Sequence, residues 1–249
     1  MLVLVGLGLW DEKDLNLMGI EEAKLCDILY LDGYTSKLFG ARKEQLEKVF
    51  EKPIQIADRA FIESGEILNY AQSNKVCLLV GGDPLIATTH TDLLLRAKEK
   101  GILTKVVHNT SIYSAIADTG LQMYKFGRSA TVAFWEENFK PTSFYDAVVE
   151  NKKRGLHTLL FLDIKAEQGR YMTANEAIDL LLEIEKERAE KVIEKANVVV
   201  CCRLGSPNQL IKYGPVEILR KFDFGPPLHV LIIPGSLHEM EERFLSQFK

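Results

Sequence analysis

The sequence predicts an α/β fold in which two αβα domains each contain a parallel or mixed sheet. Short apolar runs alternate with stretches of helical character along the 249-residue chain. This alternation is typical of mostly parallel sheets covered on both faces. The turn-forming residues Asn109, Thr110 and Ser111 indicate a junction between two halves, 1–108 and 109–249, each long enough for a core of its own.

In the first half, apolar runs predict five strands, at 2–5, 27–31, 54–57, 76–80 and 103–108. Helices are expected between them, at 14–26, 41–50, 65–73 and from about 88 to 100. Thr88 or Thr91 can cap the start of the last of these helices, and Gly101 stands where a helix end belongs.

The second half keeps the alternation, with its later strands more widely separated. Strands are expected at 130–134, 158–162, 198–202 and 229–233, and helices at 112–118, 143–153, 175–188 and 238–247. Thr173 and Glu176 have the spacing of a capping box, in which each side chain binds the backbone N–H of the other residue.

The composition excludes several classes of protein. The chain has 31 basic and 35 acidic residues and a net charge of -4, whereas nucleic-acid binders usually carry a basic excess. No apolar run approaches the ~20 residues that span a bilayer. The apolar start has no basic residues before it and runs into Asp11, so it favours a buried strand over a signal peptide. A cytoplasmic protein without nucleic-acid or membrane partners is therefore expected.

Cysteine and histidine spacing gives no sign of a metal site. The four cysteines, Cys26, Cys77, Cys201 and Cys202, form no C-x-x-C pair, which favours buried thiols in a reducing compartment over disulfides or zinc ligands. The five histidines lack metal-ligand spacing such as H-E-x-x-H. We expect no metal.

Three turns that follow predicted strands are candidate ligand sites. The first, Gly6-Leu7-Gly8-Leu9, is either a nucleotide-binding turn or only a tight turn, because Asp11 occupies the position of the third Rossmann glycine. The second, Gly81-Gly82-Asp83-Pro84, follows a buried strand, where ligands of open parallel sheets bind; alternatively, Asp83 is a local cap. The third, Arg203-Leu204-Gly205-Ser206-Pro207, has an ordinary loop with a solvated arginine as its alternative.

The residues alone supply no catalytic nucleophile. The chain has no G-x-S-x-G segment. His229 begins an apolar run, where a structural histidine with satisfied hydrogen bonds is favoured. At this level the sequence predicts a two-domain α/β protein with a small-molecule cleft.

Longer blocks of sequence carry a resemblance that narrows the function. They are Gly81 to His90, Thr110 to Ala115, Tyr124 to Gly127, Thr142 to Asp146, His157 to Lys165, Met172 to Ala177 and Ile233 to Gly235. With these blocks, in this order, the chain resembles the tetrapyrrole methylase superfamily of methyltransferases. Within it, the chain is similar to the diphthine synthases, in their compact archaeal form.

The resemblance implies a homodimer that binds S-adenosyl-L-methionine between two αβα domains and releases S-adenosyl-L-homocysteine. It implies a protein substrate, translation elongation factor 2, whose 3-amino-3-carboxypropyl-modified histidine is methylated three times on its amino group to form diphthine. Carried over by position, the donor-binding residues are Leu9, Asp83, Ile86, Ser111, Ile112, Leu162, Leu204 and His229. The chain departs from the commoner pattern at Gly81, where proline is usual, and at Leu204, where a small residue occurs; the bulkier Leu204 would alter packing on the adenine side.

Other functions stay open beside this one. The nearest is a precorrin-type methyltransferase of the same superfamily, and a dinucleotide-dependent oxidoreductase is disfavoured by the missing third glycine. A non-catalytic binding protein is the remaining alternative. Because the methyl donor is already activated, positioning is expected to supply much of the catalysis, and no general base is assigned.

Overall fold

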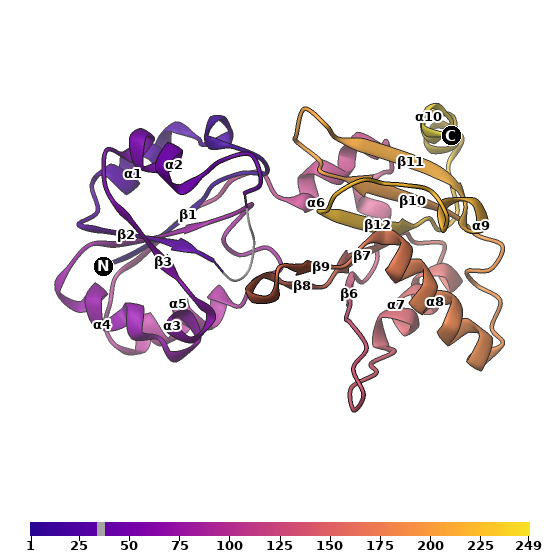
Figure 1. Cartoon of the computed structure of the whole chain (residues 1–249), viewed down its shortest axis with the longest axis horizontal. Helices are drawn as coiled ribbons and strands as arrows, with labels where there is room; N and C mark the ends of the chain where they lie inside the picture. Colours follow the sequence, from indigo (N-terminus) through magenta and orange to yellow (C-terminus); the bar gives the residue numbers. More distant parts are fainter. Residues whose placement is uncertain (34–37) are drawn as a thin grey trace. The chain divides into compact units, whose positions relative to one another are not determined.

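The computed structural model describes residues 1–33 and 38–249, and the chain divides into two compact units (Figure 1). Unit 1 comprises Met1–Ala115 with Ala166–Gln168, and unit 2 comprises Ile116–Lys165 with Gly169–Lys249. The turn-forming residues predicted the junction after His108, whereas the contacts divide the chain after Ala115. Each unit contains a five-stranded sheet of its own.

The sheet of unit 1 is parallel throughout, as predicted. Its strands are β1 (Leu2–Gly6), β2 (Ile28–Asp32), β3 (Ile54–Ala57), β4 (Val76–Val80) and β5 (Thr104–Val107), in the order β3-β2-β4-β1-β5. Every residue of β1 and β4 is buried. These central strands are continuous apolar runs because helices cover both faces of the sheet.

Helices α1 (Leu17–Lys24) and α2 (Lys43–Phe50) cover one face of this sheet, and α3 (Arg59–Ser64), α4 (Glu66–Ser73) and α5 (His90–Glu99) cover the other (Figure 1). Strand β1 is followed by the 3-10 turn η1 (Glu12–Asp14), and strand β5 is followed by the short helix α6 (Ile112–Ala115). The two cores divide by alternation along β1, since Val3 and Val5 face α1 and α2 whereas Leu2 and Leu4 face the opposite helices.

The helices of unit 1 differ from the prediction at the starts of α1 and α5 and by one additional helix. The first helix starts at Leu17 because the Asn16 side chain caps it, accepting from Gly19 N at 2.7 Å. Neither Thr88 nor Thr91 caps α5; its N-cap is Thr89, without a side-chain cap bond. Thr88 Oγ1 instead donates to the carbonyl of Pro84 at 2.6 Å. Helix α3 was not predicted.

The sheet of unit 2 is mixed. It contains β6 (Ala130–Val132), β7 (Thr158–Leu162), β10 (Asn197–Cys202), β11 (Leu210–Pro215) and β12 (His229–Ile233), in the order β11-β10-β12-β7-β6. Only the β6–β7 pair is parallel. The prediction missed β11, where Lys212 and Gly214 interrupt the apolar run. A separate hairpin pairs β8 (Ile164–Lys165) with β9 (Arg170–Tyr171).

Helices α7 (Ser143–Lys153) and α8 (Ala174–Arg188) pack on one side of this sheet, and α10 (Glu239–Leu245) lies on the other (Figure 1). The remaining elements of unit 2 are α9 (Val216–Leu219), η2 (Ile116–Thr119), η3 (Met123–Lys125) and η5 (Ser246–Phe248), whereas the 3-10 turn η4 (Ala166–Gln168), between β8 and β9, belongs to unit 1. The predicted capping box of α8 is confirmed: Glu176 Oε2 accepts from Thr173 N at 2.7 Å and Thr173 Oγ1 accepts from Glu176 N at 3.2 Å.

The four cysteines are buried and free, as predicted. Within residues 1–33 and 38–249, no helix has the length and apolar character needed to cross a membrane.

Candidate functional site

Three loops of unit 1 meet at the carboxyl edge of its sheet, because β4, β1 and β5 are parallel neighbours. Gly8 and Gly82 pair as an antiparallel bridge, with Gly82 N donating to Gly8 O at 2.6 Å. Asn109 Nδ2 donates to Gly6 O at 2.9 Å and to Asp14 O at 3.0 Å. Since ligands of open parallel sheets bind outside the carboxyl ends of the strands, these joined loops form the candidate site on unit 1.

Asp83 is the cross-link between the loop after β4 and the loop after β5. Its Oδ1 accepts from Leu85 N at 3.0 Å, and its Oδ2 accepts from His108 Nδ1 at 2.8 Å and from Asn109 N at 3.2 Å. The residue is 6% exposed. Asp83 is therefore a local cap of its own turn, one of the two interpretations given above, and it also joins two loops.

The glycines of these turns are required by geometry. Gly8 has φ +82, and a Cβ there would lie 2.4 Å from the Cβ of Asp14. Gly82 has φ +73, but a Cβ there would meet only Ser111 Cα, at 4.0 Å. The Gly82 turn thus borders open space, which lets a ligand approach its backbone closely.

We expect Gly8→Ala to lower the free energy of unfolding of unit 1 by about 2–3 kcal/mol, because it combines a strained φ with a steric clash. The clash displaces Asp14, whose Oδ2 accepts from Leu9 N at 3.0 Å and Trp10 N at 2.7 Å. Gly101→Ala is the matched control, since Gly101 has φ +70 and nothing within 4 Å of its added Cβ; we expect about 1 kcal/mol there. Denaturant unfolding measures both values, and equal losses would contradict the clash.

The eight predicted donor-binding residues lie in two groups, one on each unit. Leu9, Ile86 and Ile112 are half-buried and Asp83 and Ser111 are buried; four of them belong to the loops at the carboxyl edge of the first sheet, and Ile112 is the first residue of α6, which follows the loop after β5. The three residues on unit 2 lie at one edge of its sheet, where β10 and β7 end and β12 begins: Leu162, Leu204 and His229. These three are 7%, 6% and 4% exposed.

The ring of His229 is fully hydrogen-bonded within unit 2. Its Nδ1 accepts from Ala174 N at 3.2 Å, so the proton resides on Nε2, which donates to Pro226 O at 3.0 Å. Burial lowers the pKa of His229 to about 4, although the bond to Pro226 opposes this shift. His229 is therefore a neutral histidine with satisfied hydrogen bonds, as expected from its place at the start of an apolar run.

We expect His229 to make unit 2 less stable in mild acid. The unfolded chain binds a proton below the ordinary histidine pKa of 6.5, whereas the folded chain binds it only below about 4. Stability is thus lost as pH falls from 6.5 to 4, by about 3 kcal/mol, and no further below that. Denaturant unfolding across this range should show a correspondingly smaller loss for His229→Asn. The exposed His238, changed to asparagine, should leave the wild-type slope; an unaltered slope in His229→Asn would contradict the assignment.

Arg203 is not a solvated loop residue. Its guanidinium donates to the carbonyls of Asn208 at 3.2 Å and Phe224 at 2.9 Å, and also to that of Pro226. It therefore ties the loop after β10 to the segment that leads into His229.

A buried pair of side chains, His90 and Asp32, lies behind the loop after β4 within unit 1. His90 Nδ1 contacts the carbonyl of Pro84 at 2.8 Å, and His90 Nε2 lies 3.3 Å from Asp32 Oδ2, with both side chains fully buried. These contacts place the start of α5 beside the end of β2.

Most of the residues that hold the site together were not predicted from the sequence. Asp14 and His108 carried no assigned role, His90 was noted only as the end of the block from Gly81 to His90, and Asn109 only as a turn former. Their contacts reach across the sheet, as in the bond from Asn109 to Gly6, so they follow from the strand order and from no local motif.

Comparison with known proteins places these features in a family. The model of the Tetrapyrrole (Corrin/Porphyrin) Methylases matches residues 1–219. A diphthine synthase of Methanocella arvoryzae is 45% identical over 249 residues, which cover 98% of this chain and 96% of that protein. A crystal structure from Entamoeba histolytica matches with TM-score 0.93 and 40% identity over 100% of this chain and 98% of its own. A crystal structure of diphthine synthase matches with TM-score 0.90 and 35% identity over 100% and 96%.

Proposed function

The chain belongs to the tetrapyrrole methylase family and, within it, to the diphthine synthases, and we propose that it methylates a modified histidine of translation elongation factor 2. It is a methyltransferase that uses S-adenosyl-L-methionine. The proposed acceptor is the amino group of a 3-amino-3-carboxypropyl chain on that histidine, and three methyl groups convert it to diphthine. The observation that carries the proposal is 45% identity to a diphthine synthase over 98% of this chain.

We propose that the donor binds through the two groups of residues described above. When bound, S-adenosyl-L-methionine supplies a methyl group that is already activated on a sulfonium. The Gly82 turn fits such a ligand, because it borders open space beside Ser111. Leu9, Ile86 and Ile112 are half-buried and offer apolar contacts together with backbone groups, the mixture that an adenosyl ligand requires.

In this proposal Asp83 does not bind the donor itself but supports the loops that bind it. Both of its carboxylate oxygens already accept hydrogen bonds from within the chain. Its contribution is to hold the Gly82 turn and the Ser111 segment in one arrangement, so that the donor meets a preformed site. We also propose that the chain is a cytoplasmic homodimer that binds no metal. This part of the proposal rests on the family resemblance.

The experiment is transfer of labelled methyl from S-adenosyl-L-methionine to elongation factor 2 that carries the 3-amino-3-carboxypropyl group. We expect label on the modified factor and none on the unmodified factor, and the mass of the product gives the number of methyl groups. Transfer to a precorrin macrocycle instead would favour the related tetrapyrrole methyltransferases. Donor binding without transfer to either acceptor would overturn the proposal.

A further inference from the structure

A buried carboxylate holds an exposed imidazole at the carboxyl edge of the first sheet. His108 follows β5, and its Nδ1 lies 2.8 Å from Asp83 Oδ2. The side chain of His108 is 67% exposed, whereas that of Asp83 is 7% exposed. The backbone of His108 is held as well, since its carbonyl accepts from Asn16 Nδ2 at 2.8 Å. The ring therefore has a fixed anchor and an exposed outer edge.

The partners of Asp83 determine which ring nitrogen carries the proton. Asp83 Oδ2 also accepts from Asn109 N, and Oδ1 accepts from Leu85 N. A carboxylate in this setting is an acceptor, so His108 Nδ1 is the donor and Nε2 of the neutral ring carries the lone pair. No residue in the described part of the chain hydrogen-bonds to Nε2. Nε2 therefore belongs to a largely exposed ring, on a segment next to the loops that are proposed to bind the donor.

We propose that His108 is the proton acceptor of the methyl-transfer reaction, with Nε2 taking a proton from the ammonium group of the substrate before each transfer. This inference rests on the proposed function. A carboxylate that accepts from Nδ1–H orients the imidazole and stabilises its protonated form, which leaves Nε2 to act as a general base. His108 also stands three residues before Ser111, so its segment is one that the donor is proposed to contact.

The proton and electron balance needs no further reactant. The ammonium group gives one proton to His108 Nε2, and the imidazolium forms an ion pair with Asp83. The amine lone pair then forms an N–C bond to the methyl group as the C–S bond breaks and leaves its electron pair on sulfur. The methylated nitrogen is again an ammonium, so each of three transfers requires the loss of one proton. An exposed ring can release each proton to water between transfers.

Few other charges of unit 1 are free to act on His108. Asp14, on the loop after β1, uses its carboxylate to bind the amides of Leu9 and Trp10. Lys105, on β5, pairs with Glu22 at 2.7 Å. Asp83 is thus the charged side chain in direct contact with His108 within the described part of unit 1.

The test is His108→Asn, measured in single-turnover methyl transfer from labelled S-adenosyl-L-methionine to the modified elongation factor between pH 6 and 10. Asparagine Nδ2 can replace His108 Nδ1 as the donor to Asp83, so the loops keep their cross-link and only the base is removed. We expect transfer to slow about 10²-fold at pH 7. The deficit should shrink as pH rises and vanish once the substrate amine is neutral in solution.

Donor affinity and a second histidine variant separate this role from a structural one. The Kd for S-adenosyl-L-methionine, measured by equilibrium dialysis, should stay within about twofold of wild type in His108→Asn. His238→Asn, at an exposed histidine of unit 2, should match wild type at every pH. A deficit that is the same at all pH values, or wild-type rates at pH 7, would overturn the role of His108. Absence of transfer by the wild-type chain at every pH would overturn the proposed function itself.

Discussion

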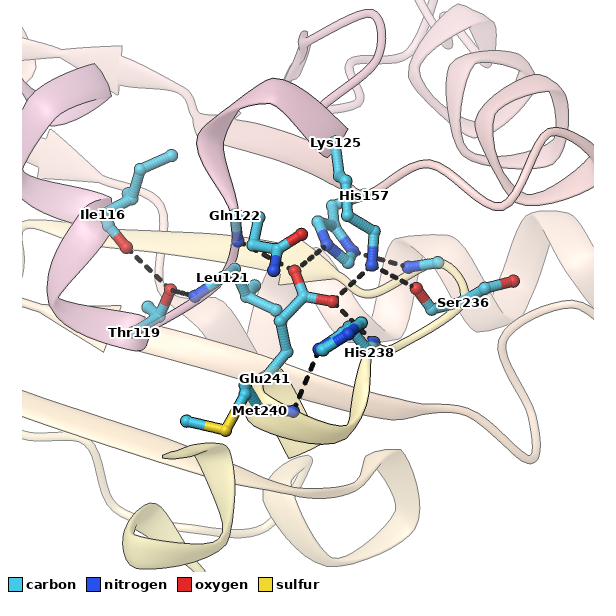
Figure 2. A network of polar contacts seen from close by, with 11 residues as sticks. Ile116, Thr119, Leu121, Gln122, Lys125, His157, Ser236, His238, Met240 and Glu241 are labelled. Carbon is cyan, nitrogen blue, oxygen red and sulfur yellow. Dashed lines mark hydrogen bonds and ion pairs between the residues drawn. The ribbon is translucent and has the colours of Figure 1, made fainter. Parts of the chain in front are cut away.

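Replacing Glu241 with alanine is expected to lower the free energy of unfolding of unit 2 by about 3–5 kcal/mol, the range for removing one partner from a buried ionic network. Glu241 is 1% exposed. Its carboxylate accepts from four donors (Figure 2): Gln122 N at 2.8 Å, His157 Nε2 at 3.0 Å, His238 N at 2.7 Å and the ammonium of Lys125. These donors come from the segment before β6, the start of β7 and the start of α10, so one side chain joins three parts of the unit.

The charge of Glu241 is essential to this role. Burial raises the pKa of the carboxyl, but the bonds from His238, Lys125, Gln122 and His157 outweigh burial and lower it to about 2. His157 is neutral, because burial lowers its pKa and its Nδ1 accepts from Gly235 N at 3.0 Å. Its Nε2–H is thus the donor to Glu241. In Glu241→Ala the N–H of His157 loses its acceptor in a buried place, and the half-buried ammonium of Lys125 loses its anionic partner and keeps only the carbonyl of Ser236.

The two tryptophans allow the loss to be assigned to one unit. Trp10 belongs to unit 1 and Trp135 to unit 2, so a Trp10→Phe background leaves fluorescence that reports unit 2 alone. Glu242→Ala, at an exposed position on the same helix, should cost less than about 0.5 kcal/mol. The Glu241 contribution is present above pH 4.5 and is lost as pH falls towards 2, so the two unfolding curves should converge in acid. Equal losses from Glu241→Ala and Glu242→Ala would refute the network.

The buried strands and the glycine turns were predictable because their signals are local. Val76–Val80 is a continuous apolar run, and glycines and Asp83 come directly after it. Neighbouring residues are therefore enough to predict both the strand and the candidate turn. Helix α3 was missed because it is short and has few apolar positions. The sequence predicts one helix that begins at Gly65, whereas in the structure Gly65 is a left-handed residue that separates α3 from α4.

The cross-links of the site were not predictable in the same way. Asn109 binds Gly6 and Asp14, which lie far away in sequence. His108 meets Asp83 only because β5 and β4 flank β1 in the sheet. In the sequence, Glu241 cannot be distinguished from the other glutamates of its helix. Its role depends on His157 and Gln122, which lie far away in the sequence and contact it only in the folded unit. Side chains that act between elements leave no periodicity in the sequence, so their roles emerge with the topology.

Asp83→Ala is expected to weaken binding of S-adenosyl-L-methionine by about 10²-fold. The substitution leaves the N–H groups of Leu85 and Asn109 and the ring of His108 without their acceptor. The two backbone N–H groups are partly buried, and each lost hydrogen bond to such a group costs about 1–3 kcal/mol, whereas the exposed ring of His108 can bond to water instead. Without the donor, the variant chain can recover part of that cost by letting the two loops separate. Binding of the donor must then bring the loops together again, and the free energy that this requires lowers the affinity.

Asp83→Asn should be almost as damaging as alanine, and this outcome identifies the mechanism. The amide keeps one oxygen for Leu85 N, but its NH₂ group then faces the backbone donor Asn109 N, and His108 Nδ1 can accept from it only after the ring proton moves to Nε2. Asp58→Ala is the matched control, since Asp58 also follows a strand of this sheet and accepts a backbone N–H, that of Phe61 at 2.8 Å, but it caps helix α3 after the outer strand β3. It should cost stability of about 1 kcal/mol and leave donor affinity unchanged. Equilibrium dialysis with labelled donor measures the donor affinity of all three variants. Wild-type donor affinity in Asp83→Ala would exclude a role of Asp83 in donor binding, because its carboxylate is the acceptor that joins the two loops.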